Sequence, residues 1–245
     1  MLSPFIALLR RAPRSALELT LPRLTEAAPD FTAADRALMA RVRPYTMTSL
    51  ERVTGLSQAV RYLVRANIPG AMAECGVWKG GSMMVVALTL LELDEVRDLY
   101  LFDTFEGMTP PTEQDITYAG VPAAELLASP TGRMKCDAAM DQVRSAVAST
   151  GYPMDRVHLV PGPVENTLPG QAPDRFALLR LDTDFYTSTA HELTHLYPRL
   201  SAGGVLVIDD YGAWKGARQA VDEYFHNAAV LMNRLDWTGR LLVKP

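Results

Sequence analysis

The chain has 245 residues, of which 48% are hydrophobic, and this composition excludes a protein that is disordered throughout. The formal net charge is −4, so no basic surplus points to a nucleic-acid partner. The only apolar run near the N-terminus is far shorter than the roughly 18 residues that span a bilayer, which argues against a membrane protein.

The two cysteines, Cys75 and Cys136, lie far apart in the sequence and form no CxxC motif. Such sparse use of cysteine favours a reducing compartment, where both thiols stay free in or near the core. We therefore expect a cytoplasmic protein.

Helical patterns dominate the first 66 residues. Apolar positions recur at three- and four-residue spacing in 31–42 and 49–66, and the sequence RPYTMTS at 43–49 interrupts them, because proline disfavours a helix just before it. The N-terminal segment also reads as an amphipathic helix. We expect residues 1–66 to form a helical cap that joins two or more copies into a homo-oligomer, and residues 67–245 to form the main domain.

From residue 70 onwards, short apolar runs alternate with helical patterns. The candidate strands are 70–75, 98–103, 156–161, 176–182 and 204–210. The helical patterns lie near 80–93, 133–149, 187–197 and 214–227. This alternation predicts an α/β fold with a doubly wound, mostly parallel sheet.

Two further segments complete this outline. Residues 230–245 read as two strands around the turn-prone sequence DWTG, so an antiparallel hairpin should close one edge and bring the sheet to seven strands. Residues 108–132 are irregular and contain prolines. Loops of that length are usually lids or functional inserts.

In an open α/β sheet, ligands bind beyond the carboxyl ends of the strands. The first candidate strand leads into Glu74 and the glycine-rich sequence CGVWKGGS, where backbone N–H groups at a helix start can approach a ligand, although a plain tight turn is the alternative. The second strand ends at Asp103. A carboxylate there can accept the ribose hydroxyls of a nucleoside, although a turn-forming aspartate is common.

Four carboxylates follow the fourth and fifth candidate strands, namely Asp182, Asp184, Asp209 and Asp210. Such clustering is costly unless a cation neutralises it. Because all the ligands would be oxygens, Mg²⁺ or Ca²⁺ suits the cluster better than zinc.

The sequence HELTH at 191–195 matches the H-E-x-x-H zinc motif. The extended motif is absent, because Pro198 stands where glycine would be and Ser201 where a third histidine would be. We interpret this segment as a helix that covers the sheet, and we expect it to turn His191, Glu192 and His195 towards solvent or a neighbour.

The motifs AECGVWKGGS, FDTFEGM, LRLDTDFYTSTAHELTHLYPRL and GGVLVIDDYG together resemble the macrocin O-methyltransferase family, the TylF-like enzymes that methylate sugars in natural-product and antibiotic biosynthesis. The match runs from RPYTM to the segment after IDDYG. The resemblance implies a class I, Rossmann-like methyltransferase fold, S-adenosylmethionine as the cofactor and a divalent metal, Mg²⁺.

The resemblance also implies roles for particular residues. The metal ligands correspond to Asp182, Asp209 and Asp210, and the general base to Asp184 or to Asp182 itself. The implied cofactor-binding residues are Thr46, Met47, Glu74, Gly76, Val77, Ser82, Asp103, Thr104, Phe105, Gly162, Val164 and Asp182. Candidate substrate contacts are Tyr45, Tyr186 and Tyr211. Asn166 stands where relatives often carry aspartate.

We therefore expect an S-adenosylmethionine- and Mg²⁺-dependent O-methyltransferase that acts on a sugar hydroxyl of a natural-product glycoside, with two neighbouring hydroxyls chelated by the metal. Three alternatives remain at this stage: O-methylation of a catechol-like phenol, a Mg²⁺-dependent hydrolase that uses the aspartate cluster, and a cofactor-binding protein without activity.

Overall fold

A computed structural model describes residues 30–129 and 136–245. The amphipathic segment that we expected at the N-terminus lies outside these residues. Within the described residues, no helix is both long enough and apolar enough to cross a membrane.

Two helices precede the sheet, as predicted: α3 (Ala33–Val42) and α4 (Leu50–Arg65). Thr32 and Asp35 form a capping box at the start of α3, and the Ser49 side chain accepts a backbone N–H of α4, which fixes where each helix begins. Between the helices, the short 3₁₀ turn η1 (Arg43–Tyr45) occupies part of the predicted loop.

The predicted seven-stranded sheet is confirmed. Its parallel strands are β1 (Ala71–Cys75), β2 (Leu99–Asp103), β3 (Val157–Pro161), β4 (Phe176–Leu181) and β5 (Leu200–Ile208). The antiparallel hairpin is formed by β6 (Met232–Arg234) and β7 (Arg240–Val243). The strand order is β3-β2-β1-β4-β5-β7-β6.

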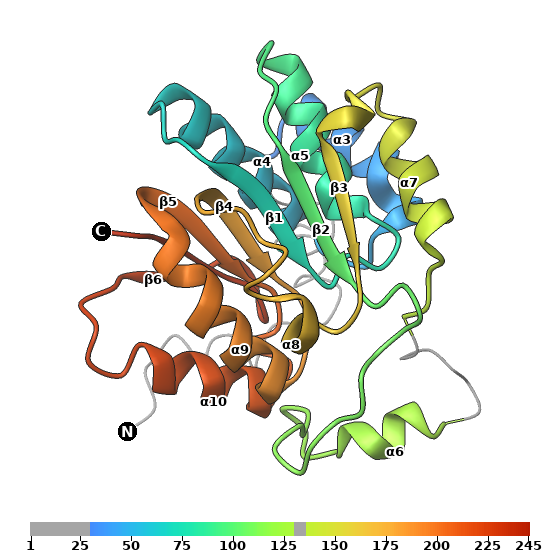
Figure 1. Cartoon of the computed structure of the whole chain (residues 1–245), viewed down its shortest axis with the longest axis vertical. Coiled ribbons are helices and arrows are strands. Elements are labelled where there is room, and N and C mark those ends of the chain that lie inside the picture. Colours follow the sequence, from blue (N-terminus) through green and yellow to red (C-terminus); the bar gives the residue numbers. More distant parts are fainter. Residues whose placement is uncertain (1–29, 130–135) are drawn as a thin grey trace, which may run out of the picture.

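Helices cover both faces of the sheet. The remaining helices are α5 (Gly81–Glu92), α6 (Ala123–Leu127), α7 (Met140–Ala148), α8 (Val164–Thr167), α9 (Tyr186–Leu196) and α10 (Lys215–Tyr224), with the 3₁₀ turns η2 (Met154–Arg156) and η3 (Tyr197–Arg199). Figure 1 shows α8, α9 and α10 on one face and α3, α4, α5 and α7 on the other. Helix α6 was not predicted and lies within the long 108–132 segment.

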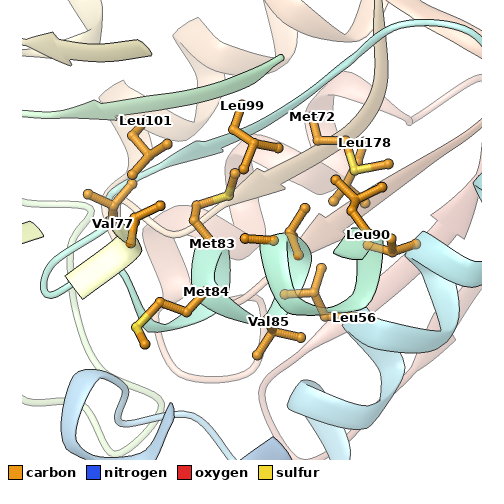
Figure 2. Close-up of a cluster of buried hydrophobic side chains, with 14 of the residues drawn as sticks. Leu56, Met72, Val77, Met83, Met84, Val85, Leu90, Leu99, Leu101 and Leu178 are labelled. Carbon is orange, nitrogen blue, oxygen red and sulfur yellow. The ribbon is translucent and has the colours of Figure 1, made fainter. Parts of the chain in front are cut away.

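Side chains alternate across the strands and so build a core on each face. Met72 and Leu178 pack into the core of α4 and α5, whereas Ala73 and Leu179 pack into the core of α9 and α10. Figure 2 shows Met83 and other α5 side chains facing the strand residues of the first core. The position of a polar residue near the end of a strand therefore determines on which face of the sheet its side chain lies.

The strand order reverses between β1 and β4. The chain passes from β1 outwards through β2 and β3, then returns to β4 and continues outwards to β5. Ligands of doubly wound sheets bind in the crevice at such a switch point, beyond the carboxyl ends of the strands.

Candidate active site

The loops after β1 and β4 lie against each other at the switch point. The backbone N–H of Asp182 donates to the carbonyl of Cys75 at 2.9 Å. Gly76 has φ +79°, and a Cβ built there would lie 2.1 Å from the carbonyl oxygen of Asp182. Only glycine tolerates both the positive φ and the short distance, so glycine at this position lets the two loops approach each other closely.

A cavity of about 460 Å³ opens beyond these strand ends. It lies in the size range of small-molecule sites. Among its lining residues are most of the positions that we expected to bind cofactor or substrate: Tyr45, Thr46, Met47, Glu74, Gly76, Val77, Ser82, Asp103, Thr104, Gly162, Val164 and Asp182.

Three expected contacts lie outside this cavity. Phe105 is buried in the core instead of lining the cavity, and its backbone N–H donates to Asp103. The hydroxyls of Tyr186 and Tyr211 donate to Glu223 and Asp222 on α10, and neither ring lines the cavity. Asn166 is exposed and also lies outside it.

Arg180 is a buried cation at the centre of the site that the sequence reading did not single out. Glu74 is two residues beyond Met72, and Arg180 is two residues beyond Leu178, so both side chains share one face, in paired register. The guanidinium pairs with the carboxylates of Glu74, Asp182 and Asp209.

Glu74 keeps one oxygen free beside this arginine. The residue is fully buried, and its Oε2 atom has no hydrogen-bond partner among the described residues. Burial raises the pKa of Glu74 to about 7, against the opposing charge of Arg180. An unpaired carboxylate oxygen in a cavity wall is suited to an amine or another donor from a ligand.

Asp182, Asp209 and Asp210 come together as the sequence predicted. One carboxylate oxygen from each lies within 4.8 Å of the others. The Oδ2 atom of Asp210 has no partner among the described residues, while Arg52 of α4 pairs with Asp209. The three side chains thus offer an all-oxygen set of the kind that holds Mg²⁺.

Burial, together with the crowding of negative charge, shifts the pKa values in this cluster. Burial raises the pKa of Asp182 and of Asp210 well above its usual range, and neighbouring carboxylates raise each further. Arg180 offsets only part of this effect at Asp182. A divalent cation would favour the ionised forms that these groups otherwise resist.

Asp184 lies beside the cluster, on a turn that follows β4. Strand β4 ends at Leu181, so strand alternation does not reach residue 184; instead the backbone turns, and Asp184 adopts φ +66°. The Nε1–H of Trp214 donates to its Oδ1 at 2.7 Å. Burial, and then the charge of Asp182, raises the pKa of Asp184 to about 7, a value suited to a general base.

Asp103 holds the loops after β1 and β2 together. One carboxylate oxygen accepts the backbone N–H groups of Val77 and Trp78 at 2.7 and 3.0 Å. The other accepts the N–H of Phe105 at 2.8 Å. Asp103 therefore shapes the wall of the cavity, and its predicted contact with a ribose stays a prediction.

The segment between η1 and α4 covers the start of α5. A Cβ built at Gly81 would lie 2.5 Å from the carbonyl oxygen of Tyr45 and 2.7 Å from Cβ of Thr46. This contact brings the YTM sequence, residues 45–47, against the glycine-rich turn, where its residues line the cavity.

Glu192 of the HELTH sequence faces inwards, so our expectation that it points to solvent was wrong. The carboxyl is fully buried and accepts the hydroxyl of Thr183 at 3.0 Å, because Glu192 shares the α9 face that carries Ser188 and Leu196. His191 and His195 are half-buried, with ring centroids 4.3 Å apart. The glutamate is thus turned away from both imidazoles and does not complete a zinc site.

Both cysteines are free thiols. Cys75 is buried in the sheet, whereas Cys136 lines the cavity. Burial and the nearby charge of Asp184 raise the pKa of Cys136 to about 12, so its thiol stays protonated and is a weak nucleophile.

Asp115 anchors the 108–132 segment to the body. It is fully buried and accepts the N–H of Thr112 at 2.6 Å and that of Tyr186, at the start of α9, at 2.7 Å. Part of the segment that looked irregular in the sequence is therefore fixed against the helices beside the site.

Comparison with known proteins assigns this chain to an enzyme family. The model of the macrocin-O-methyltransferase (TylF) family matches residues 18–244. The chain belongs to this family. It is accordingly an S-adenosylmethionine-dependent O-methyltransferase, which excludes the hydrolase reading of the aspartate cluster.

Individual relatives agree with this assignment. The methyltransferase is 36% identical to 8-demethyl-8-(2,3-dimethoxy-alpha-L-rhamnosyl)-tetracenomycin-C 4'-O-methyltransferase of Streptomyces olivaceus, over 84% of this chain and 79% of that one. It is 34% identical to mycinamicin III 3''-O-methyltransferase of Micromonospora griseorubida, over 74% and 70%. Among solved structures, the O-methyltransferase NovP superposes with a TM-score of 0.72 at 29% identity, covering 82% of each chain.

Proposed function

We propose that this methyltransferase transfers a methyl group to a sugar hydroxyl of a natural-product glycoside, with Mg²⁺ held by Asp182, Asp209 and Asp210. The observation that carries the metal part is the convergence of three carboxylate oxygens within 4.8 Å at the wall of the cavity. The unpartnered Oδ2 of Asp210 supports it, because a buried oxygen without a donor is costly.

The acceptor class follows from the relatives. The Streptomyces olivaceus enzyme is named for a rhamnosyl group on tetracenomycin C, and the Micromonospora griseorubida enzyme is named for mycinamicin III. Bound at the three aspartates, a divalent cation would supply a positive charge that orients two neighbouring hydroxyls and lowers the pKa of the one that reacts. No comparable observation favours a catechol acceptor.

Cofactor binding is proposed for the part of the cavity between the ends of β1 and β2. The free Oε2 of Glu74 and the glycine-rich turn at Gly76 fit a ligand that carries donor groups and needs a close backbone approach. S-adenosylmethionine supplies an electrophilic methyl group whose leaving sulfur needs no acid.

Asp184 is the proposed general base. Its carboxylate lies beside the metal-ligand cluster, and the hydrogen bond from Trp214 holds its orientation. A carboxylate there can take the proton of a hydroxyl placed between the cluster and the cofactor.

The deciding experiment measures methyl transfer from S-adenosylmethionine to methyl α-L-rhamnoside and to catechol, with Mg²⁺ and with EDTA. We expect transfer to the rhamnoside only, and only with the metal. Cofactor binding by calorimetry should persist in EDTA. Full activity in EDTA would overturn the metal part, and transfer to catechol alone would overturn the acceptor class.

A further inference from the structure

Two aromatic side chains stand exposed at the rim of the cavity. Tyr118 is 68% exposed and Trp237 is 55% exposed, although both line the cavity. Their ring centroids are 5.5 Å apart, with the planes inclined at 69°. Large apolar groups that stay exposed beside a ligand site are typical of a binding surface.

Hydrogen bonds order the backbone on which both rings stand. The N–H of Tyr118 donates to Ala213 at 2.9 Å, so its segment is fastened to the chain just after β5. Next to Trp237, the carboxylate of Asp236 accepts the N–H groups of Thr238 and Gly239 at 2.9 and 2.7 Å. Aromatic side chains on ordered backbone lose little entropy when a ligand binds.

The same turns adjoin the aspartate cluster. The hydroxyl of Thr238 donates to the carbonyl of Asp209 at 2.6 Å, and the N–H of Ala213 donates to the carbonyl of Asp210 at 2.9 Å. Trp237 therefore directly precedes a residue that is hydrogen-bonded to Asp209, and the backbone of Tyr118 is bonded to a residue that is hydrogen-bonded to Asp210. The two rings therefore line the same cavity as the aspartates, at its exposed margin.

We propose that Tyr118 and Trp237 form a subsite for the apolar, ring-containing aglycone of the acceptor, an inference that rests on the proposed function. A glycoside has a polar sugar and a larger group beyond its glycosidic bond, and the cavity offers carboxylates inside and aromatic rings at the rim. The occupant is a small molecule, because two side chains fall far short of the roughly 20–30 residues a side in a stable protein interface.

The test compares 2-naphthyl α-L-rhamnoside with methyl α-L-rhamnoside, which share the sugar and differ in the aglycone. Trp237→Ala and Tyr118→Ala should each lower kcat/KM for the naphthyl glycoside about three- to tenfold, chiefly through KM, because aromatic contacts contribute on that scale. The values for the methyl glycoside should stay within about twofold, since such surface changes have small effects elsewhere. Tyr62→Ala, at an exposed tyrosine outside the cavity, is the matched control and should change neither.

Equal losses for both glycosides, or no loss for the naphthyl glycoside, would overturn the subsite. A smaller mass for the Trp237→Ala variant in light scattering would assign the rings to a contact between copies and would also overturn it. Methylation of neither glycoside would count against the proposed function. The affinity of each glycoside for the enzyme with bound S-adenosylhomocysteine then tests the subsite separately. The subsite requires the naphthyl glycoside to bind more tightly than the methyl glycoside, and equal or weaker binding would overturn it.

Discussion

Asp184 shows how one residue can be tuned by its surroundings. Burial and the charge of Asp182 raise its pKa to about 7, while the hydrogen bond that Trp214 donates acts in the opposite direction and lowers the pKa. A bound cation would lower this pKa further. Activity should therefore rise with pH through an acid limb centred at or below about 7, because only the ionised carboxylate accepts a proton.

Replacing Asp184 with asparagine should lower kcat by about 10²–10⁴-fold, the usual contribution of a general base, and should remove this acid limb. Cofactor and Mg²⁺ affinity, measured by calorimetry, should be retained, because the three proposed metal ligands stay in place. If Asp184→Asn is as fast as the parent while Asp182→Asn is inactive, the base is Asp182.

Glu192 gives a prediction about stability. Its complete burial raises the carboxyl pKa well above the ordinary value of 4.5. Because the pKa is higher in the folded state, the contribution of Glu192 to the free energy of unfolding is fully present below the unfolded-state pKa and is lost as pH rises through the folded-state pKa.

Glutamine stays neutral at every pH, so Glu192→Gln should gain stability relative to the parent as pH rises from 5 to 8. The difference can grow by up to about 1.4 kcal/mol per pH unit within the window between the two pKa values. Urea unfolding at several pH values measures it. Glu51→Gln, at an exposed position on α4, is the control. A constant difference between Glu192→Gln and the parent would show that this carboxyl does not take up a proton on folding.

At the scale of elements, the loops after β1 and β2 depend on Asp103. Its carboxylate joins the N–H groups of Val77 and Trp78 to that of Phe105. Asp103→Ala should weaken S-adenosylmethionine binding by roughly 1.5–3 kcal/mol, the scale of hydrogen bonds to a charged group, because both the loop and the predicted ribose contact are lost.

Calorimetry with the Asp103→Ala variant is the direct measurement. Asp98→Ala is the matched control, since Asp98 lies just before the same strand at its other end and pairs with Arg156 and His158. Its cofactor affinity should equal that of the parent. Unchanged affinity in Asp103→Ala would remove this residue from the cofactor site.

The elements were predictable where residue patterns are local. Buried strands read as apolar runs, and parallel strands bring their carboxyl ends to one edge, so the meeting of Asp182 with Asp209 followed from the strand order. Arg180 could have been found, because a charge within the apolar run FALLRL is rare without partners. Arg52 could not, because its partner Asp209 lies 157 residues away and no local pattern links them.

The wrong expectation for Glu192 has a different origin. We judged Glu192 by its polarity, although helical spacing from Ser188 and to Leu196 places it on the buried face of α9. The placement of Trp237 at the rim depends on how the β6–β7 turn packs against the end of β5. The expectation that Tyr186 and Tyr211 contact the substrate stays a prediction, although their hydroxyls are hydrogen-bonded to Glu223 and Asp222 on α10.

At the scale of the whole molecule, the proposed metal ligands follow the central strand β4 and its neighbour β5, and Arg52 connects Asp209 to α4. The expected homo-oligomer stays a prediction, since the N-terminal segment lies outside the described residues. Deleting residues 1–30 should reduce the number of copies per particle, which light scattering measures as a fall in mass larger than that of the deleted residues. An unchanged number of copies would place any contact between copies elsewhere in the chain.

Cation binding should also stabilise the whole fold. A ligand that binds only the folded state at 100 times its Kd adds about 2.7 kcal/mol to the free energy of unfolding, so saturating Mg²⁺ should raise the Tm. Protons compete for the same oxygens, because the pKa values of Asp182 and Asp210 are raised. The Mg²⁺-induced rise in Tm should therefore shrink as pH falls from 8 to 6.

Asp209→Asn should abolish the Mg²⁺-induced rise in Tm, whereas Glu192→Gln, on the opposite face of the sheet, should retain it. An equal rise in Asp209→Asn and the parent would mean that Mg²⁺ binds somewhere other than this cluster.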